Sequence, residues 1–139
     1  MPTRFDFWLG ETHKGMNVLA ANIAVWRADK GFDTNWMIVP EKLMLVVSEL
    51  GEAMEAYRHL TKQTLNHLQA EALPSDTTEE GKWPDIEQSK WVDNFREEIA
   101  DTLIRLLDLA GSLGIDVDRV VARKMVVNEG RPTRHGKEC

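Results

Sequence analysis

The sequence predicts an all-α protein, most simply a bundle of four helices. Apolar residues recur every three or four positions in several stretches of the chain, the spacing that places them on one face of a helix. No stretch shows the apolar–polar alternation of a half-buried strand. With 139 residues, the chain has the length of one ordinary domain, so we expect a single domain over residues 1–139.

The N-terminal half predicts two helices. Residues 1–14 show no helical period, and we expect an irregular N-terminal arm. A first helix over about 15–30 follows, with its apolar stripe at Met16, Leu19, Ile23 and Trp26. A second helix begins near Pro40, which suits a first helical turn, and runs to about residue 72. We expect its buried stripe at Leu43, Val46, Val47, Leu50 and Met54.

The C-terminal half predicts a long loop and two further helices. Residues 74–90 contain two prolines, a glycine and five acids, which indicates a loop. A third helix over about 89–113 has its expected buried stripe at Phe95, Ile99, Thr102, Leu103, Leu106, Leu107 and Ala110. Asp116 is placed to cap a fourth helix that ends near Gly130. Residues 131–139 form a basic, polar tail.

Composition excludes several classes of protein. The formal net charge of −6 and the pI near 5.2 argue against a general nucleic-acid binder, which needs a basic surface. The single cysteine, Cys139, cannot form an internal disulfide or a cysteine-rich metal site. No apolar run reaches the roughly 18 residues of a membrane span, and the N-terminus lacks a signal-peptide pattern. We therefore expect a cytoplasmic protein without a membrane or nucleic-acid partner.

Two pairs of carboxylates lie close to the apolar stripes. Glu49 and Glu52 are three residues apart on the second helix, and Glu98 and Asp101 are three apart on the third, so each pair shares a helix face. Unpaired charges resist burial, and a cation would remove that cost. Oxygen ligands are those that Mg²⁺ prefers. The pairs therefore predict a Mg²⁺ site; the alternative is that these acids are solvated residues on helix surfaces.

The C-terminal end is basic in an otherwise acidic chain. Lys124, Asn128 and Arg131 are spaced four and three residues apart, so they can project on one side of the helix end. Lysine and arginine suit phosphate oxygens, which favours a phosphate-binding role beside a Mg²⁺ site. The alternative is a solvated tail that offsets the negative end of the last helix.

Three blocks of the chain resemble a known family. SELGEAMEAYR at 48–58, EIADTLIRLLDLAGSLGID at 98–116 and KMVVNEGRPTRHGK at 124–137 are similar to the MazG-like, all-α nucleoside triphosphate pyrophosphohydrolases, including enzymes that act on dCTP and dUTP. The resemblance spans roughly residues 15–137. It implies a MazG-like helical bundle assembled as a homodimer or a homotetramer built from two dimers. It also implies Mg²⁺-dependent hydrolysis of a nucleoside triphosphate to the monophosphate and pyrophosphate, with Mn²⁺ as a substitute ion.

The resemblance also implies roles for individual residues. The metal ligands would be Glu49, Glu52, Glu98 and Asp101, and the groups that hold the phosphates or sugar would be Lys124, Asn128 and Arg131. Trp36 would stack on the base, with Asn22 as a polar partner, which favours pyrimidine deoxynucleotides and a role in cleaning the nucleotide pool. Trp36 as a core or interface tryptophan is the alternative.

The predicted mechanism is an in-line attack of water on the α-phosphorus. Glu49 or Glu52 would accept the proton, while Lys124 and Arg131 would stabilise the departing pyrophosphate. The family often has an acid at the position of Ser48, so the general base is left unassigned. Ser48 also keeps open a different class of function, a non-catalytic nucleotide-binding or helical interaction module with a decayed site.

Overall fold

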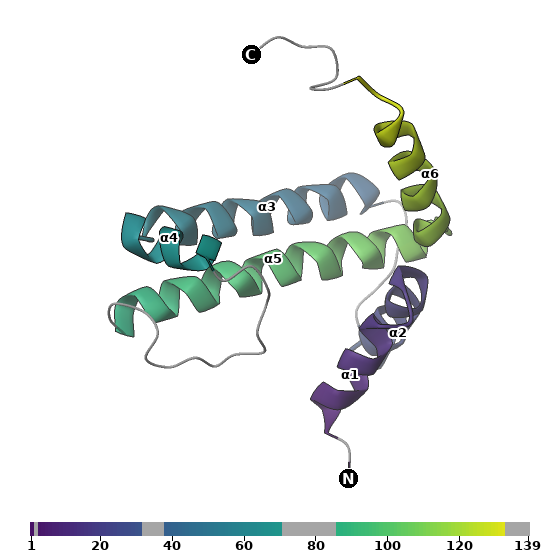
Figure 1. Cartoon of the computed structure of the whole chain (residues 1–139). Helices are drawn as coiled ribbons and strands as arrows, with labels where there is room; N and C mark the ends of the chain where they lie inside the picture. The colour runs from purple at the N-terminus through teal and green to yellow at the C-terminus, as the bar shows by residue number, and fades with distance from the viewer. Residues whose placement is uncertain (2, 32–37, 71–85, 133–139) are drawn as a thin grey trace. The chain divides into compact units, whose positions relative to one another are not determined.

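The structure is a computed structural model that describes residues 1, 3–31, 38–70 and 86–132. Every regular element in these residues is an α-helix, with no strand among them, so the all-α class is confirmed (Figure 1). No helix in these ranges is both long and apolar enough to cross a membrane. The helices are α1 (Arg4–Thr12), α2 (Met16–Asp29), α3 (Val39–Arg58), α4 (Lys62–Ala70), α5 (Ile86–Ser112) and α6 (Val117–Glu129).

The chain divides into two compact units. Unit 1 comprises residues 1–39 and 106–139, and unit 2 comprises residues 40–105. Helix α5 therefore belongs to unit 2 up to Arg105 and to unit 1 from Leu106 onwards. The four-helix bundle and the single domain remain predictions from the sequence, and each unit is described by itself.

The core of unit 1 lies between α2 and the last turns of α5. Ala20 and Ile23 of α2 are buried together with Leu107 of α5. The two helices approach closely at Gly111, because a Cβ atom added there would lie 3.4 Å from the Cβ of Ala20. Arg27 forms an ion pair with Asp108 at the same contact. The small residues Gly111 and Ala20 thus allow the two backbones to pack closely.

Helices α2 and α6 cap each other's N-termini. The side chain of Asn17 accepts the backbone N–H of Val117 at 2.8 Å and that of Asp118 at 3.4 Å. In return, the carboxylate of Asp118 accepts the N–H of Met16 at 2.9 Å and that of Asn17 at 3.4 Å. The first N–H groups of a helix have no partner within the helix, so each helix supplies what the other lacks.

Asp116 completes this arrangement, as the sequence predicts. Its side chain accepts the N–H of Arg119 at 3.1 Å and the side-chain N–H of Asn17 at 2.7 Å. Both hydrogen bonds favour the charged carboxylate and hold the pKa of Asp116 below its usual value. Helix α6 then ends at Glu129, one residue before the expected Gly130.

The expected irregular arm is wrong for residues 4–12, which form α1. A capping box starts this helix: the hydroxyl of Thr3 accepts the N–H of Asp6, and the Asp6 side chain accepts the N–H of Thr3. Thr3 and Asp6 are a visible start signal, but a nine-residue helix has too few turns to display an apolar period.

In unit 2, α3 and α5 lie side by side and run in opposite directions (Figure 1). The ring centroids of Tyr57, near the end of α3, and Phe95 lie 6.3 Å apart. Two residues later, the ring of His59 stacks on that of Trp91, with 3.8 Å between the ring centroids. Residue numbers therefore rise along α3 while those of their partners on α5 fall. Antiparallel pairing extends this register back to Glu49, which contacts Arg105.

The second predicted helix is two helices in the structure, because α3 ends at Arg58 and α4 starts at Lys62. Buried Gln88, from the first turn of α5, bridges the break between them. Its side chain donates to the carbonyl of His59 at 2.8 Å and accepts the N–H of Thr61 at 2.9 Å and the hydroxyl of Thr64 at 2.8 Å. Residues 86–90, expected in the loop, thus start α5; residues 74–85 lie outside the described ranges.

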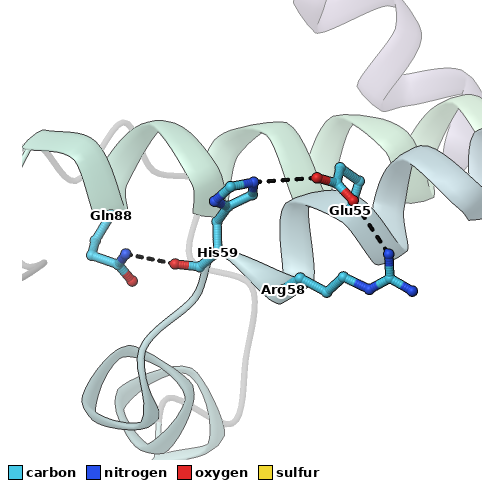
Figure 2. A network of polar contacts seen from close by, with 4 residues as sticks. All are labelled: Glu55, Arg58, His59 and Gln88. Carbon is cyan, nitrogen blue, oxygen red and sulfur yellow. Dashed lines mark hydrogen bonds and ion pairs between the residues drawn. The ribbon is translucent and has the colours of Figure 1, made fainter.

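The polar network at this break continues onto the surface of α3 (Figure 2). The ring of His59 lies 3.3 Å from the carboxylate of Glu55, which also pairs with Arg58 at 3.4 Å. Stacking on Trp91 and the contact with Glu55 together fix the orientation of His59. The stacking of His59 on Trp91 joins the end of α3 to α5.

The expected burial of the apolar stripes is largely wrong for a single chain. On α3, Val46 is buried as expected, but the rest of its stripe is exposed: Leu43, Val47, Leu50 and Met54. On α5, Leu107 is buried, whereas Ile99, Leu103 and Leu106 are exposed. Helical spacing shows that residues share a face, but it does not show that the same chain covers that face.

Candidate metal centre

Three of the four predicted carboxylate ligands meet between α3 and α5. Glu49 comes from α3, and Glu98 and Asp101 come from adjacent turns of α5. One carboxylate oxygen from each residue lies within 4.8 Å of the others. We call these three residues the carboxylate cluster. The antiparallel pairing of the two helices brings Glu49 to the face that Glu98 and Asp101 share.

The electrostatics of the cluster oppose three negative charges. Burial is the largest cause that raises the pKa of Glu98 above its usual value. The adjacent Glu49 carboxyl and the negative charges of Glu52 and Asp101 raise this pKa further. Glu52, although exposed and outside the cluster, is therefore close enough for its charge to act on Glu98.

The cluster fits a hard divalent cation. The side-chain oxygen Oε2 of Glu98 is buried and has no hydrogen-bond partner among the described residues. Glu49 is also buried, with only 7% of its surface exposed. A cation held by all three carboxylates would partner the Glu98 oxygen and offset the repulsion, and carboxylate oxygens are the ligands that Mg²⁺ and Mn²⁺ accept.

An arginine that the sequence reasoning missed also belongs to this site. Nε of Arg105 forms an ion pair with Oε1 of Glu49. Arg105 follows Asp101 by four residues and Glu98 by seven, so it lies on the same face of α5. The spacing could have placed Arg105 on the face of α5 that carries Glu98 and Asp101. Its pairing with Glu49 could not be predicted, because it depends on how α3 packs against α5.

The remaining predicted site residues are in unit 1 or outside the described residues. Asn22 on α2 donates its amide N–H to Glu11 at 2.7 Å and to the carbonyl of Val18 at 3.1 Å. The bond to Glu11 joins α2 to α1, whereas the bond to Val18 lies within α2. Trp36 lies outside the described residues, so its role in stacking on a base stays a prediction.

The three phosphate-binding candidates lie on or just after α6. Lys124 and Arg131 are exposed, while Asn128 is half-buried, and its side-chain oxygen has no partner among the described residues. Arg131 donates its backbone N–H to the carbonyl of Asn128 at 3.1 Å. The three side chains thus follow each other along one helix end, and their phosphate-binding role stays a prediction.

Comparison with known protein families, curated proteins and solved structures finds no match for this chain. The resemblance to MazG-like enzymes therefore depends on the three sequence blocks alone.

Proposed function

We propose that the protein is a Mg²⁺-dependent nucleoside triphosphate pyrophosphohydrolase of the MazG-like kind. The observation that carries this proposal is the meeting of Glu49, Glu98 and Asp101 within 4.8 Å, from two helices that are far apart in the sequence. The sequence blocks that resemble the family contain these same residues. Carboxylates from two helices that lie close together, with one buried oxygen that lacks a partner, lower the stability of the fold. A bound cation would offset this cost.

The chain's own carboxylates divide into two roles. Glu49, Glu98 and Asp101 would hold the ion, which when bound would neutralise phosphate charge and lower the pKa of water. Glu52 is exposed one turn after Glu49 and lies outside the cluster, whereas Glu49 is one of the proposed ligands of the ion. Glu52 is therefore the better candidate to accept the proton from the attacking water. In this assignment Ser48 need not supply a base.

The basic residues of α6 would act on the triphosphate. Lys124 and Arg131 carry exposed positive charges that suit the oxygens of the departing pyrophosphate. Asn128 offers an unpartnered carbonyl oxygen that could accept a hydrogen bond from a sugar hydroxyl.

We also propose that the protein acts as a homodimer or homotetramer. The exposed apolar residues of α3 include Leu43, Met44, Leu45, Val47, Leu50 and Met54, each between 45% and 62% exposed. By their spacing, Leu43, Val47, Leu50 and Met54 share one face of α3, and an exposed apolar face supports an interaction site. Sedimentation equilibrium would test this assembly, and a monomer at micromolar concentration would contradict it.

Product analysis tests the activity. The protein is incubated with each common NTP and dNTP, in Mg²⁺ and in EDTA, and the products are separated. We expect a monophosphate and pyrophosphate only in the presence of Mg²⁺, with the preferred base identified in the same experiment. Binding of a nucleotide without turnover would instead support the non-catalytic module.

A matched pair of variants assigns the activity to the cluster. Glu98→Gln removes a proposed ligand, whereas Glu97→Gln makes the same change at the exposed neighbouring residue on α5. We expect turnover to be lost in the first variant and kept in the second. Equal activity of the two variants would contradict the proposed metal site.

A further inference from the structure

Arg105 places a positive charge at the carboxylate cluster. Its guanidinium pairs through Nε with Oε1 of Glu49, a buried residue whose carboxylate lies close to those of Glu98 and Asp101. A buried carboxylate among other acids needs a counter-charge, because burial and like charges both disfavour its ionised form. In the protein without a bound metal, Arg105 supplies that counter-charge.

The two members of this ion pair differ in their access to water. The Arg105 side chain is 43% exposed, whereas that of Glu49 is 9% exposed. The guanidinium can therefore turn into solvent and keep much of its hydration, while the carboxylate stays in place. The ion pair is thus well placed to open on the arginine side.

A divalent cation and Arg105 would compete for the same carboxylate. A cation held by Glu49, Glu98 and Asp101 would share Glu49 with a guanidinium, and the two positive charges would repel each other at short range. The divalent cation would contact three carboxylates, including the unpartnered oxygen of Glu98, whereas Arg105 carries a single charge and pairs with Glu49. The exchange therefore favours the cation when it is abundant.

We infer that Arg105 is an internal counter-ion that occupies Glu49 in the metal-free protein and leaves it when a divalent cation binds. This inference deepens the proposed function and rests on it, since it concerns how the same site is regulated. By this exchange Arg105 sets the affinity for the ion. The site would then keep its ion pair without metal and bind the ion more weakly than it would without Arg105.

Calorimetric titration with Mn²⁺ and Mg²⁺ tests the inference on the full chain. Arg105→Gln removes the competing charge, and we expect it to tighten cation binding by about five- to tenfold. Arg58→Gln is the matched control, because it removes one exposed arginine that pairs with Glu55. Arg58 follows Glu49 by nine residues on α3, which places it about 14 Å further along the helix axis. We expect the control to bind the ions as the unmodified protein does.

A second measurement uses the unmodified protein, so its result does not depend on whether a variant folds. The side-chain Nε–H signal of Arg105 is followed by NMR during titration with Mg²⁺. We expect this signal to move towards that of a solvated arginine as the site fills. An Arg105 signal that keeps its position at saturating Mg²⁺ would overturn the inference.

The outcomes separate this inference from the proposed function. Absence of cation binding in the unmodified protein, or equal binding by Glu98→Gln, would overturn the proposed metal site and the role of Arg105 together. Binding that depends on Glu98 but is unchanged or weakened in Arg105→Gln would overturn only the role of Arg105. Weakened binding would mean that Arg105 orients Glu49 for the ion.

Discussion

Acidic residues have opposite effects on stability in the two units of this protein. In unit 1, the carboxylates of Asp116 and Asp118 accept N–H groups at the starts of α2 and α6. In unit 2, Glu49, Glu98 and Asp101 face one another, and one oxygen of Glu98 has no partner among the described residues. The pKa of Asp116 is lowered by hydrogen bonds, while that of Glu98 is raised by burial and like charges.

This difference distinguishes a structural acid from a candidate functional one. A carboxylate that receives N–H donors stabilises the fold as it stands. A carboxylate that is partly buried among other carboxylates lowers the stability of the metal-free protein, and only a proton or a cation can relieve it. The first experiments each alter one of these two kinds of acid or its hydrogen-bond partner, and the last alters an exposed ion pair as a reference.

The largest expected effect is on the cluster. Asp101→Asn should lower turnover by at least about 1,000-fold, because a lost ligand removes several kcal/mol of electrostatic stabilisation. The melting temperature of the metal-free variant should not fall, because the substitution removes one of several negative charges that repel one another. Activity assays and thermal unfolding in EDTA check both parts. A large loss of stability would mean that Asp101 is structural.

The reciprocal caps should respond in the opposite way. Asn17→Ala removes the acceptor of two N–H groups and the donor to Asp116, so we expect a loss of about 2 kcal/mol in the free energy of unfolding. Asn66→Ala, at an exposed position on α4, should change it by less than about 0.5 kcal/mol. Denaturant unfolding measures both, and equal values would contradict the capping role.

The two signs of pKa shift predict opposite pH dependences in EDTA. Asp116 has a lowered pKa when folded, so its contribution to stability is full above its unfolded value and is lost as the pH falls through the folded value. Glu98 has a raised pKa when folded, so stability increases as the pH falls from above that value towards its unfolded value.

Melting temperatures measured in EDTA between neutral pH and pH 3 test this prediction. We expect a gain in stability on mild acidification that is absent in Glu98→Gln. A loss should follow at lower pH that is reduced in Asp116→Asn. The same profile in both variants and the unmodified protein would mean that other groups govern the pH dependence.

The smallest effect is expected at the surface. Arg58→Gln breaks the ion pair with Glu55, whose side chains are 69% and 60% exposed. Exposed pairs contribute little, so we expect a change of about 0.5 kcal/mol or less in the free energy of unfolding. Urea unfolding would measure it. A loss above about 1 kcal/mol would indicate that the pair supports the stacking of His59 on Trp91.

The sequence predicted the helices better than their surroundings. The bounds of α2, the Asp116 cap and the end of α6 near Gly130 follow local rules of spacing and capping, so the sequence sufficed for them. Within the predicted α2 stripe, Ile23 is buried but Trp26 is exposed. The break between α3 and α4 was missed because Gln88, a residue distant in the sequence, satisfies its backbone groups. The burial of Leu50 and Leu103 was predicted wrongly, because the partner of an apolar face is a long-range property.

By itself, the sequence determined the all-α class and the two carboxylate pairs, since both depend on intervals of three or four residues along one helix. Tertiary structure decided that Glu49 joins Glu98 and Asp101, that Glu52 lies outside this group, and that Arg105 pairs with Glu49. It also decided that Asn17 and Asp118 cap each other's helices. Local periodicity fixes which residues share a face, but only the packing of two helices fixes which faces meet.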